Sequence, residues 1–196
     1  MKKKMILLII NFIMAMLFLG CAKKEISWIE EGKKAIAESR YEEAVGHLLR
    51  AVEEEEEIEE AFRAMGIIYW EREEYAQAKR YFLRALHAGA KESGTLYNFL
   101  AVIELKEENY ESALVYFQKG LTFEENTEAL NQEMRWNEIA VHEEMRNWEM
   151  AKQKVEEYLL LYPDDKEMKR EEEFLRSRGM SEEMMEISEI SEKIEG

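Results

Sequence analysis

Apolar residues recur at intervals of three and four along most of the chain beyond residue 25, which is the spacing of one face of an α-helix. Two such faces are formed by Leu96, Leu100 and Ile103 and by Leu114, Phe117 and Leu121. Polar segments of turn length separate the apolar runs at 38–40, 72–74, 106–109 and 146–147. The pattern predicts an all-α fold in which helices are joined in pairs by short turns.

A longer period is superimposed on this helical pattern. Its clearest segments are Tyr41-Glu42-Glu43-Ala44, Tyr75-Ala76-Gln77-Ala78, Tyr110-Glu111-Ser112-Ala113 and Trp148-Glu149-Met150-Ala151, whose alanines are 34, 35 and 38 residues apart. Twelve residues before the alanines stand Gly32, Gly66, Ala101 and Ile139, and four residues after them stand Leu48, Phe82, Phe117 and Val155. Small residues let two helices pack closely, and one pair cannot bury its apolar face alone. We therefore expect at least three stacked helix pairs.

These residues resemble the tetratricopeptide repeat, a helix–turn–helix unit of about 34 residues. The resemblance implies a right-handed superhelical stack of about four repeats, near residues 25–58, 59–92, 94–127 and 132–165. It also implies core-packing roles for the aromatic residues Trp28, Phe62, Tyr97, Phe82 and Phe117. The fourth repeat departs from the pattern, with Arg135 at an aromatic position and Tyr158 at a small-residue position. Trp136 fills the aromatic role if the register shifts by one residue.

The segment after the repeats begins with Pro163-Asp164-Asp165, which is typical of a helix stop followed by the cap of a new helix. We expect residues 166–179 to form a C-terminal capping helix that covers the last repeat and ends at Gly179. The acidic tail, residues 180–196, is either a further short helix or a frayed end. The repeat domain itself is expected to occupy residues 21–165.

Composition supports helices and narrows the choice of partner. The chain contains one proline and nine glycines in 196 residues, and its hydrophobic content of 46% is sufficient for a core. It carries 27 Lys and Arg against 43 Asp and Glu, a net charge of −16. Such a chain repels phosphate backbones, so nucleic acid is not expected as a partner.

The N-terminus has the form of a bacterial secretion signal, residues 1–20. Lys2, Lys3 and Lys4 precede an apolar run from Met5 to Leu19 that is interrupted only by Asn11. A helix of that length spans about 22 Å, whereas the hydrocarbon core of a bilayer is about 30 Å thick. The run is therefore shorter than a typical membrane span and matches the apolar region of a signal peptide.

The run ends in Leu17-Phe18-Leu19-Gly20-Cys21, which resembles the lipobox of bacterial lipoproteins. That resemblance implies acylation of the Cys21 thiol and cleavage before Cys21, and the alternative is an ordinary signal anchor with an incidental cysteine. Cys21 is the only cysteine, so no disulfide can form within one chain. In a Gram-negative host Ala22 would permit export to the outer membrane, and in a Gram-positive host the protein would lie on the outer face of the cytoplasmic membrane.

The resemblance also implies a binding surface, because the first helix of each repeat lines the concave side of such a stack. The family's groove positions correspond to Ile26, Ile29, Lys33, Ile36, Glu60, Arg63, Ile67, Trp70, Thr95, Asn98, Val102, Leu105, Glu133, Trp136, Ala140 and Glu143. This strip is unusually apolar, which favours a bound helix or extended peptide. We expect the partner-binding groove to comprise Arg63, Ile67, Trp70, Asn98, Val102 and Leu105.

Two alternatives remain for this strip. The chain's own C-terminal segment could cover it, or Trp70 could pack between the first and second repeats. A clamp for a C-terminal carboxylate is disfavoured because Glu60 stands near Lys33 and Asn98, where a basic residue would help.

Other chemistry is weakly represented. The acidic block from Glu53 to Glu57 lacks the glycine and alternating ligands of a calcium loop, so we interpret it as a solvated helix end. His142-Glu143 begins like a zinc-protease helix but lacks the second histidine. We expect no catalytic residues, no metal, no cofactor and no small-molecule substrate. The sequence predicts a scaffold or adaptor lipoprotein that binds a protein or peptide, with an accessory protein that positions a cell-envelope enzyme, such as a peptidoglycan hydrolase, as the alternative.

Overall fold

The computed structural model describes residues 27–178. Its helices are α2 (Trp28–Ala37), α3 (Tyr41–Glu53), α4 (Ile58–Glu71), α5 (Tyr75–His87), α6 (Gly94–Lys106), α7 (Tyr110–Gly120), α8 (Glu128–Glu144) and α9 (Trp148–Leu161). Residues 166–178 are also helical and are called the C-terminal helix below. Residues 27–178 contain no strand, and no helix among them has the length and hydrophobicity needed to cross a bilayer. The signal segment, Cys21, Ile26 and the tail 180–196 lie outside the described residues.

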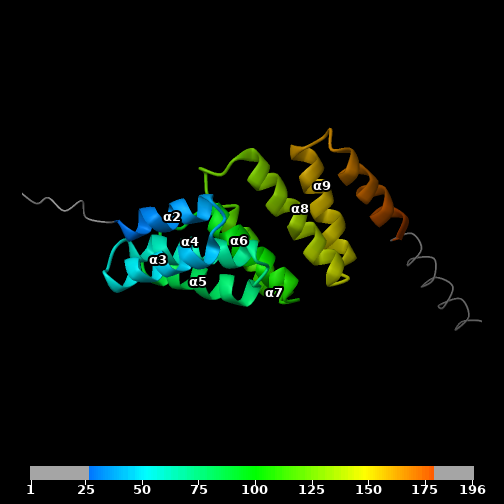
Figure 1. Cartoon of the computed structure of the whole chain (residues 1–196). Coiled ribbons are helices and arrows are strands. Elements are labelled where there is room, and N and C mark those ends of the chain that lie inside the picture. Colours follow the sequence, from blue (N-terminus) through cyan, green and yellow to red (C-terminus); the bar gives the residue numbers. More distant parts are fainter. Residues whose placement is uncertain (1–26, 179–196) are drawn as a thin grey trace, which may run out of the picture.

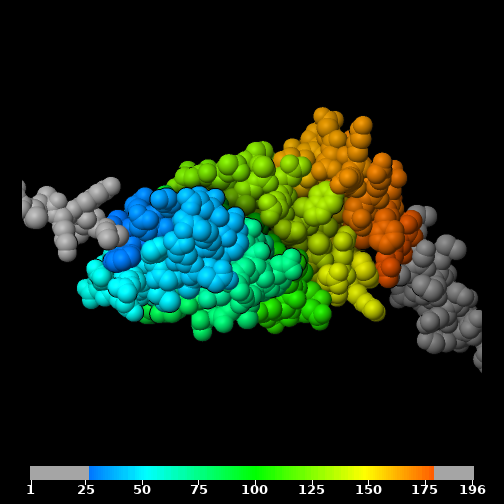
Figure 2. All heavy atoms as spheres, viewed as in Figure 1, coloured from blue at the N-terminus to red at the C-terminus, as the bar shows by residue number. Residues whose placement is uncertain are grey.

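Consecutive helices form the pairs α2–α3, α4–α5, α6–α7 and α8–α9, and these pairs are stacked along the length of the molecule (Figure 1). The colours in Figure 2 follow one another along the same direction, so each repeat adjoins the next. The predicted all-α stack of helix pairs is therefore confirmed. The aromatic residues Phe62, Tyr97, Phe82 and Phe117 are buried in it, as expected for packing residues.

The same type of turn joins the two helices of every pair. Its second residue has a left-handed backbone at Ser39 (φ 56°), Glu73 (φ 59°), Glu108 (φ 61°) and Arg146 (φ 55°). The residue that follows donates its amide to a carbonyl five residues back, as in the 2.8 Å bond from Arg40 N to Ala35 O. This arrangement ends the first helix and reverses the chain. None of the four is glycine, so each turn costs about 1 kcal/mol of backbone strain.

The two helices of a repeat touch where a small residue faces a large one. A Cβ atom on Gly32 would lie 2.8 Å from Leu48 Cδ2, and one on Gly66 would lie 2.5 Å from Phe82 Cδ1. Neither contact could be accommodated without displacing the facing side chain, which is fully buried in both cases. The glycines therefore set the distance between the helices.

The third and fourth repeats keep this contact, but the residue on the first helix is larger there and, in the fourth repeat, the residue on the second helix is smaller. Ala101 and Phe117 lie in one cluster in the third repeat, and Ile139 and Val155 lie in another in the fourth. The larger Ile139 thus faces a smaller Val155. In the fourth repeat Ile139 is only 3% exposed, and Trp136 packs against the cluster that contains it.

Neighbouring repeats are joined by aromatic and ionic contacts. Phe99 of α6 stacks on Phe82 with ring centroids 5.0 Å apart and meets Trp70 edge-on at 4.9 Å. The Lys79 Nζ atom lies 2.9 Å from Oε2 of the buried Glu104. The second and third repeats are therefore connected by an aromatic contact and by a compensated buried charge.

One residue of the acidic block before α4, Glu56, has a structural role. Ser27 Oγ and the Trp28 backbone amide, which begins α2, both donate hydrogen bonds to the Glu56 carboxylate. The carboxylate therefore caps the start of the first helix, where the helix dipole favours negative charge. Glu53, Glu54, Glu55 and Glu57 are exposed, as expected for a solvated helix end.

The C-terminal helix packs one side onto the fourth repeat through the buried residues Met168 and Leu175. Met168 lies one repeat length after the buried Met134, so the two methionines occupy equivalent positions. The residue five positions further on is the core residue Ile139 in α8 but the exposed Glu173 in the C-terminal helix. Lys169, next to Met168, is exposed as well. The positions that would receive a second helix thus carry charge.

A pair of carboxyls lies between α8 and this helix. Glu143 occupies the same repeat position as Trp70, eight residues before the repeat alanine. Trp70 contacts Phe99 of the next repeat, whereas Glu143 lies close to Glu171 of the C-terminal helix. Burial, Glu171 and Glu144 raise the pKa of Glu143 to about 7. Its buried Oε1 receives no hydrogen bond from a donor among the described residues. The neutral acid is therefore the form that this interface favours.

Gly66→Ala is expected to lower the unfolding free energy by about 1–2 kcal/mol, because overpacking against Phe82 outweighs the better helix propensity of alanine. Gly46→Ala is the matched control, since its added Cβ would meet nothing within 4 Å on the exposed side of α3. The control should gain up to about 1 kcal/mol. Urea unfolding followed by circular dichroism measures both. Equal effects of the two changes would show that the Gly66–Phe82 contact does not limit the helix spacing.

Glu143→Gln is expected to stabilise the protein increasingly as pH rises. A carboxyl whose folded pKa lies above its unfolded value loses stability as pH increases from the unfolded pKa near 4.5 to the folded value near 7. The half-buried position reduces the full shift to an expected gain of about 1–2 kcal/mol at pH 8. Urea unfolding at pH 5.5 and pH 8 tests this, with the exposed Glu173→Gln as control. A gain independent of pH would contradict the assignment.

Candidate functional site

The first helices of the repeats, α2, α4, α6 and α8, carry the predicted groove residues. Arg63 is exposed on α4 and is held by Glu60, with Nε–Oε2 and Nη2–Oε1 distances of 2.8 and 2.6 Å. This bidentate pair fixes the orientation of the guanidinium. It also raises the pKa of Arg63 and lowers that of Glu60. Arg63 therefore presents a neutralised charge.

Ile67 and Trp70 are half-buried and belong to the core of the second and third repeats. The Trp70 ring meets Tyr75 edge-on at 5.5 Å in addition to Phe99. Trp70 therefore packs between the second and third repeats, so the alternative of packing between the first and second is wrong. Part of its surface is still accessible, but truncation of this ring would disturb the stack itself.

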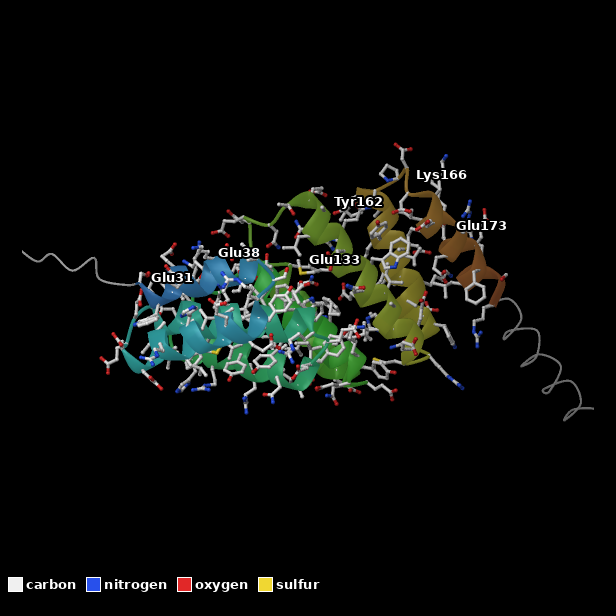
Figure 3. All side chains as sticks on the ribbon, in the orientation of Figure 1. Glu31, Glu38, Glu133, Tyr162, Lys166 and Glu173 are labelled. Atoms are coloured by element: carbon white, nitrogen blue, oxygen red, sulfur yellow. The ribbon has the colours of Figure 1, made fainter. Side chains whose placement is uncertain are left out.

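Asn98 is placed at the centre of the groove side and is only 9% exposed. Its Nδ2 donates a 2.9 Å hydrogen bond to Oε1 of Glu133 on α8. Its Oδ1 is buried and has no hydrogen-bond partner in the described part of the chain. Figure 3 labels Glu133, which lies between α8 and the first three repeats. The pair therefore joins the third and fourth repeats and leaves one acceptor unsatisfied.

Val102 and Leu105 are half-buried and line a hollow of about 460 Å³ between α6 and α8, called the apolar hollow below. Asn137 and Ala140 form its other side. Its remaining lining consists of Lys106, Glu108, Tyr110 and Glu144. Its lining is therefore mixed: Val102, Leu105 and Ala140 supply the apolar part, and polar and charged side chains supply the rest.

A second hollow, of about 340 Å³, lies further toward the start of α8 and is called the acidic hollow below. It is lined by Ala129, Gln132, Glu133, Trp136, Tyr158, Asp165 and Glu167. The sequence placed Glu133 and Trp136 in the groove but gave no indication that α9 and the start of the C-terminal helix also contribute. The sequence identified Asp165 only as the cap of a new helix, and this was its one indication about the side of the hollow next to the C-terminal helix.

The acidic hollow is held by a hydrogen-bond network. The Tyr158 hydroxyl donates to Asp165 Oδ2 at 2.7 Å, and Gln132 Nε2 donates to the Tyr158 oxygen at 2.7 Å. The other oxygen of Asp165 accepts the backbone amides of Glu167 and Met168 at 3.0 and 3.1 Å. Burial and the Asp165 hydrogen bond raise the pKa of Tyr158 to about 12, whereas the Met168 amide and the Tyr158 hydroxyl lower the pKa of Asp165. Both groups therefore keep fixed protonation states near neutral pH.

The remaining titratable groups are dispersed. His142 is buried on α8, and burial lowers its pKa. The buried Glu138 is compensated by Lys154, whose Nζ lies 3.3 Å from Glu138 Oε1. No group of three or more His, Cys, Asp or Glu within residues 27–178 is arranged to hold a metal ion. Two of the hollows among the described residues adjoin α8, one toward α6 and one toward α9.

Comparisons with known proteins identify the fold. Neither a protein-family model nor a curated protein matches the chain. Among solved structures, it is similar to YrrB, described as a tetratricopeptide-repeat protein with an unusual peptide-binding site, with a TM-score of 0.66 and 22% identity over 81% of this chain and 80% of that chain.

It is similar to MamA as well, with a TM-score of 0.66 and 12% identity over 81% of this chain and 85% of that one. A third is PilF of Pseudomonas aeruginosa, with a TM-score of 0.57 and 19% identity over 76% and 67% of the two chains. At these identities the likeness concerns the fold. The repeat spacing, the helix pairs and these structures together show that the chain is a tetratricopeptide-repeat protein by fold.

Proposed function

We propose that this protein is a lipid-anchored adaptor that recruits a partner protein or peptide through the groove side of its repeat stack. The observation that carries the proposal is the apolar hollow. Val102 and Leu105 present partly exposed apolar surface there, opposite Ala140, within a lining that also contains polar and charged side chains. Accessible apolar surface of this kind costs free energy in water and is relieved when a partner covers it.

The fold supports a binding role. Tetratricopeptide-repeat proteins such as YrrB, whose description names a peptide-binding site, share the arrangement of this chain. Proteins with this fold typically act as interaction scaffolds and not as enzymes. The dispersed titratable groups of residues 27–178 suit the same role.

The anchor is the second part of the proposal. The basic start, the short apolar run, Gly20 and Cys21 are the features that support lipidation. Two or three acyl chains would hold the protein to a membrane of the cell envelope, whereas one chain gives only marginal binding. The net charge of −16 makes electrostatic attachment to anionic lipids unfavourable, so the acyl chains would supply the attachment.

Ala140→Gln is expected to fill the apolar hollow and to reduce partner capture at least about tenfold, or ~1.4 kcal/mol. Glutamine keeps a good helix propensity, and Ala140 is only half-buried, so α8 should remain intact. Crosslinking and pull-down from intact cells measures capture. The matched control is Ala76→Gln on the exposed side of α5, and circular dichroism checks folding. Equal capture of the same partner by both variants would move the binding site away from this hollow.

Cys21→Ser is expected to abolish incorporation of an alkyne-labelled fatty acid into the protein. The reason is that Cys21 carries the only thiol of the chain. Metabolic labelling followed by detergent phase partitioning compares this variant with the native protein. Labelling that persists in Cys21→Ser would contradict a lipid anchor at this residue, while leaving the groove proposal untouched.

A further inference from the structure

We propose that the acidic hollow receives a lysine or arginine side chain of the bound partner. The inference rests on the proposed function, because it describes the chemistry of the peptide that the groove binds. It follows from the charge of the hollow, its aromatic wall and its distance from the apolar hollow.

The charge in the hollow is of one sign. Glu133, Asp165 and Glu167 are its charged lining residues, and no lysine or arginine lines it. Glu133 and Glu167 are exposed, and neither forms an ion pair within residues 27–178. Both oxygens of Asp165 already accept hydrogen bonds, from Tyr158, Gln132, Glu167 and Met168, so Asp165 contributes its negative charge to the hollow and not a free acceptor. Complementary charge would come from the partner.

An aromatic wall stands beside these carboxylates. Trp136 lines the hollow and meets Tyr158 edge-on, with ring centroids 6.1 Å apart. The indole is the aromatic side chain that attracts cations most strongly, and a guanidinium also stacks on it. The Tyr158 hydroxyl is already engaged with Asp165, which holds this wall in place. A carboxylate next to an indole face favours a cationic side chain over a neutral one.

Glu133 is held from the α6 side by Asn98. Asn98 binds the same Glu133 that lines the hollow, and its side chain is nine-tenths buried. Glu133 Oε1 and Asn98 Oδ1 are both acceptors, whereas ammonium and guanidinium groups carry only donors. A basic side chain that reaches Glu133 would therefore supply N–H donors to its exposed carboxylate.

The spacing along α8 gives the proposal a sequence signature. Glu133 in the acidic hollow and Ala140 in the apolar hollow are seven residues apart on one helical face, or about 10 Å. An extended peptide covers this distance in about three residues. The expected ligand therefore carries a basic residue and a large apolar residue three positions apart.

A library of random dodecapeptides displayed on phage, selected on the full-length protein in detergent, tests this inference. The hollow variant is Glu133→Gln with Glu167→Gln, in which the new glutamine at 133 can still accept from Asn98 Nδ2. The control is Glu111→Gln with Glu156→Gln, which removes the same charge from exposed positions of α7 and α9. Circular dichroism confirms that all are folded.

The native protein and the control should enrich peptides with the basic–apolar spacing. Fluorescence anisotropy should show their Kd at least tenfold weaker on the hollow variant and weaker in high salt. The inference would be overturned if the enriched peptides lacked a basic residue or bound the hollow variant as tightly as the native protein. If Ala140→Gln still abolished binding of those peptides, the proposed function would stand. Failure to enrich any peptide on the native protein would contradict the proposed function and this inference together.

Discussion

The close approach of two helices within each repeat is the contact on which the rest of the structure depends. Gly32 and Gly66 leave room for Leu48 and Phe82, so the second helix lies directly against the first. That spacing turns one side of every first helix inward to its partner and leaves another side for the groove. Interiors tolerate little extra volume, so the exchange from glycine with phenylalanine to Ile139 with Val155 keeps the packed volume similar.

The groove gains its character from the repeat interfaces. Between the second and third repeats Trp70 and Phe99 form an aromatic contact, and the predicted groove residues Ile67 and Trp70 pack against the core. Toward the C-terminus, Asn98 with Glu133 and Glu143 with Glu171 replace such contacts. Polar contacts that involve carboxyl groups therefore take the place of aromatic packing toward the C-terminal end of the stack.

The sequence was sufficient for the repeat and its register, because the small–large pairs and the alanines recur at nearly constant spacing. It did not reveal how far each groove residue is covered. Asn98 and Trp70 occupy surface positions of the repeat pattern, yet contacts from α8 and α6 bury most of the first and part of the second. The acidic hollow was missed for a similar reason. Tyr158 and Asp165 reach it from α9 and the C-terminal helix, and such contacts depend on helix orientation, which a single sequence does not encode locally.

A stack of helix pairs is open at its ends, and an exposed apolar end could accept the first repeat of another copy and grow into a filament. The C-terminal helix places Lys169 and Glu173 where earlier repeats place core residues. Covering these charges with another apolar helix would require their desolvation. The same two side chains that leave the helix one-sided thus oppose head-to-tail polymerisation through this helix.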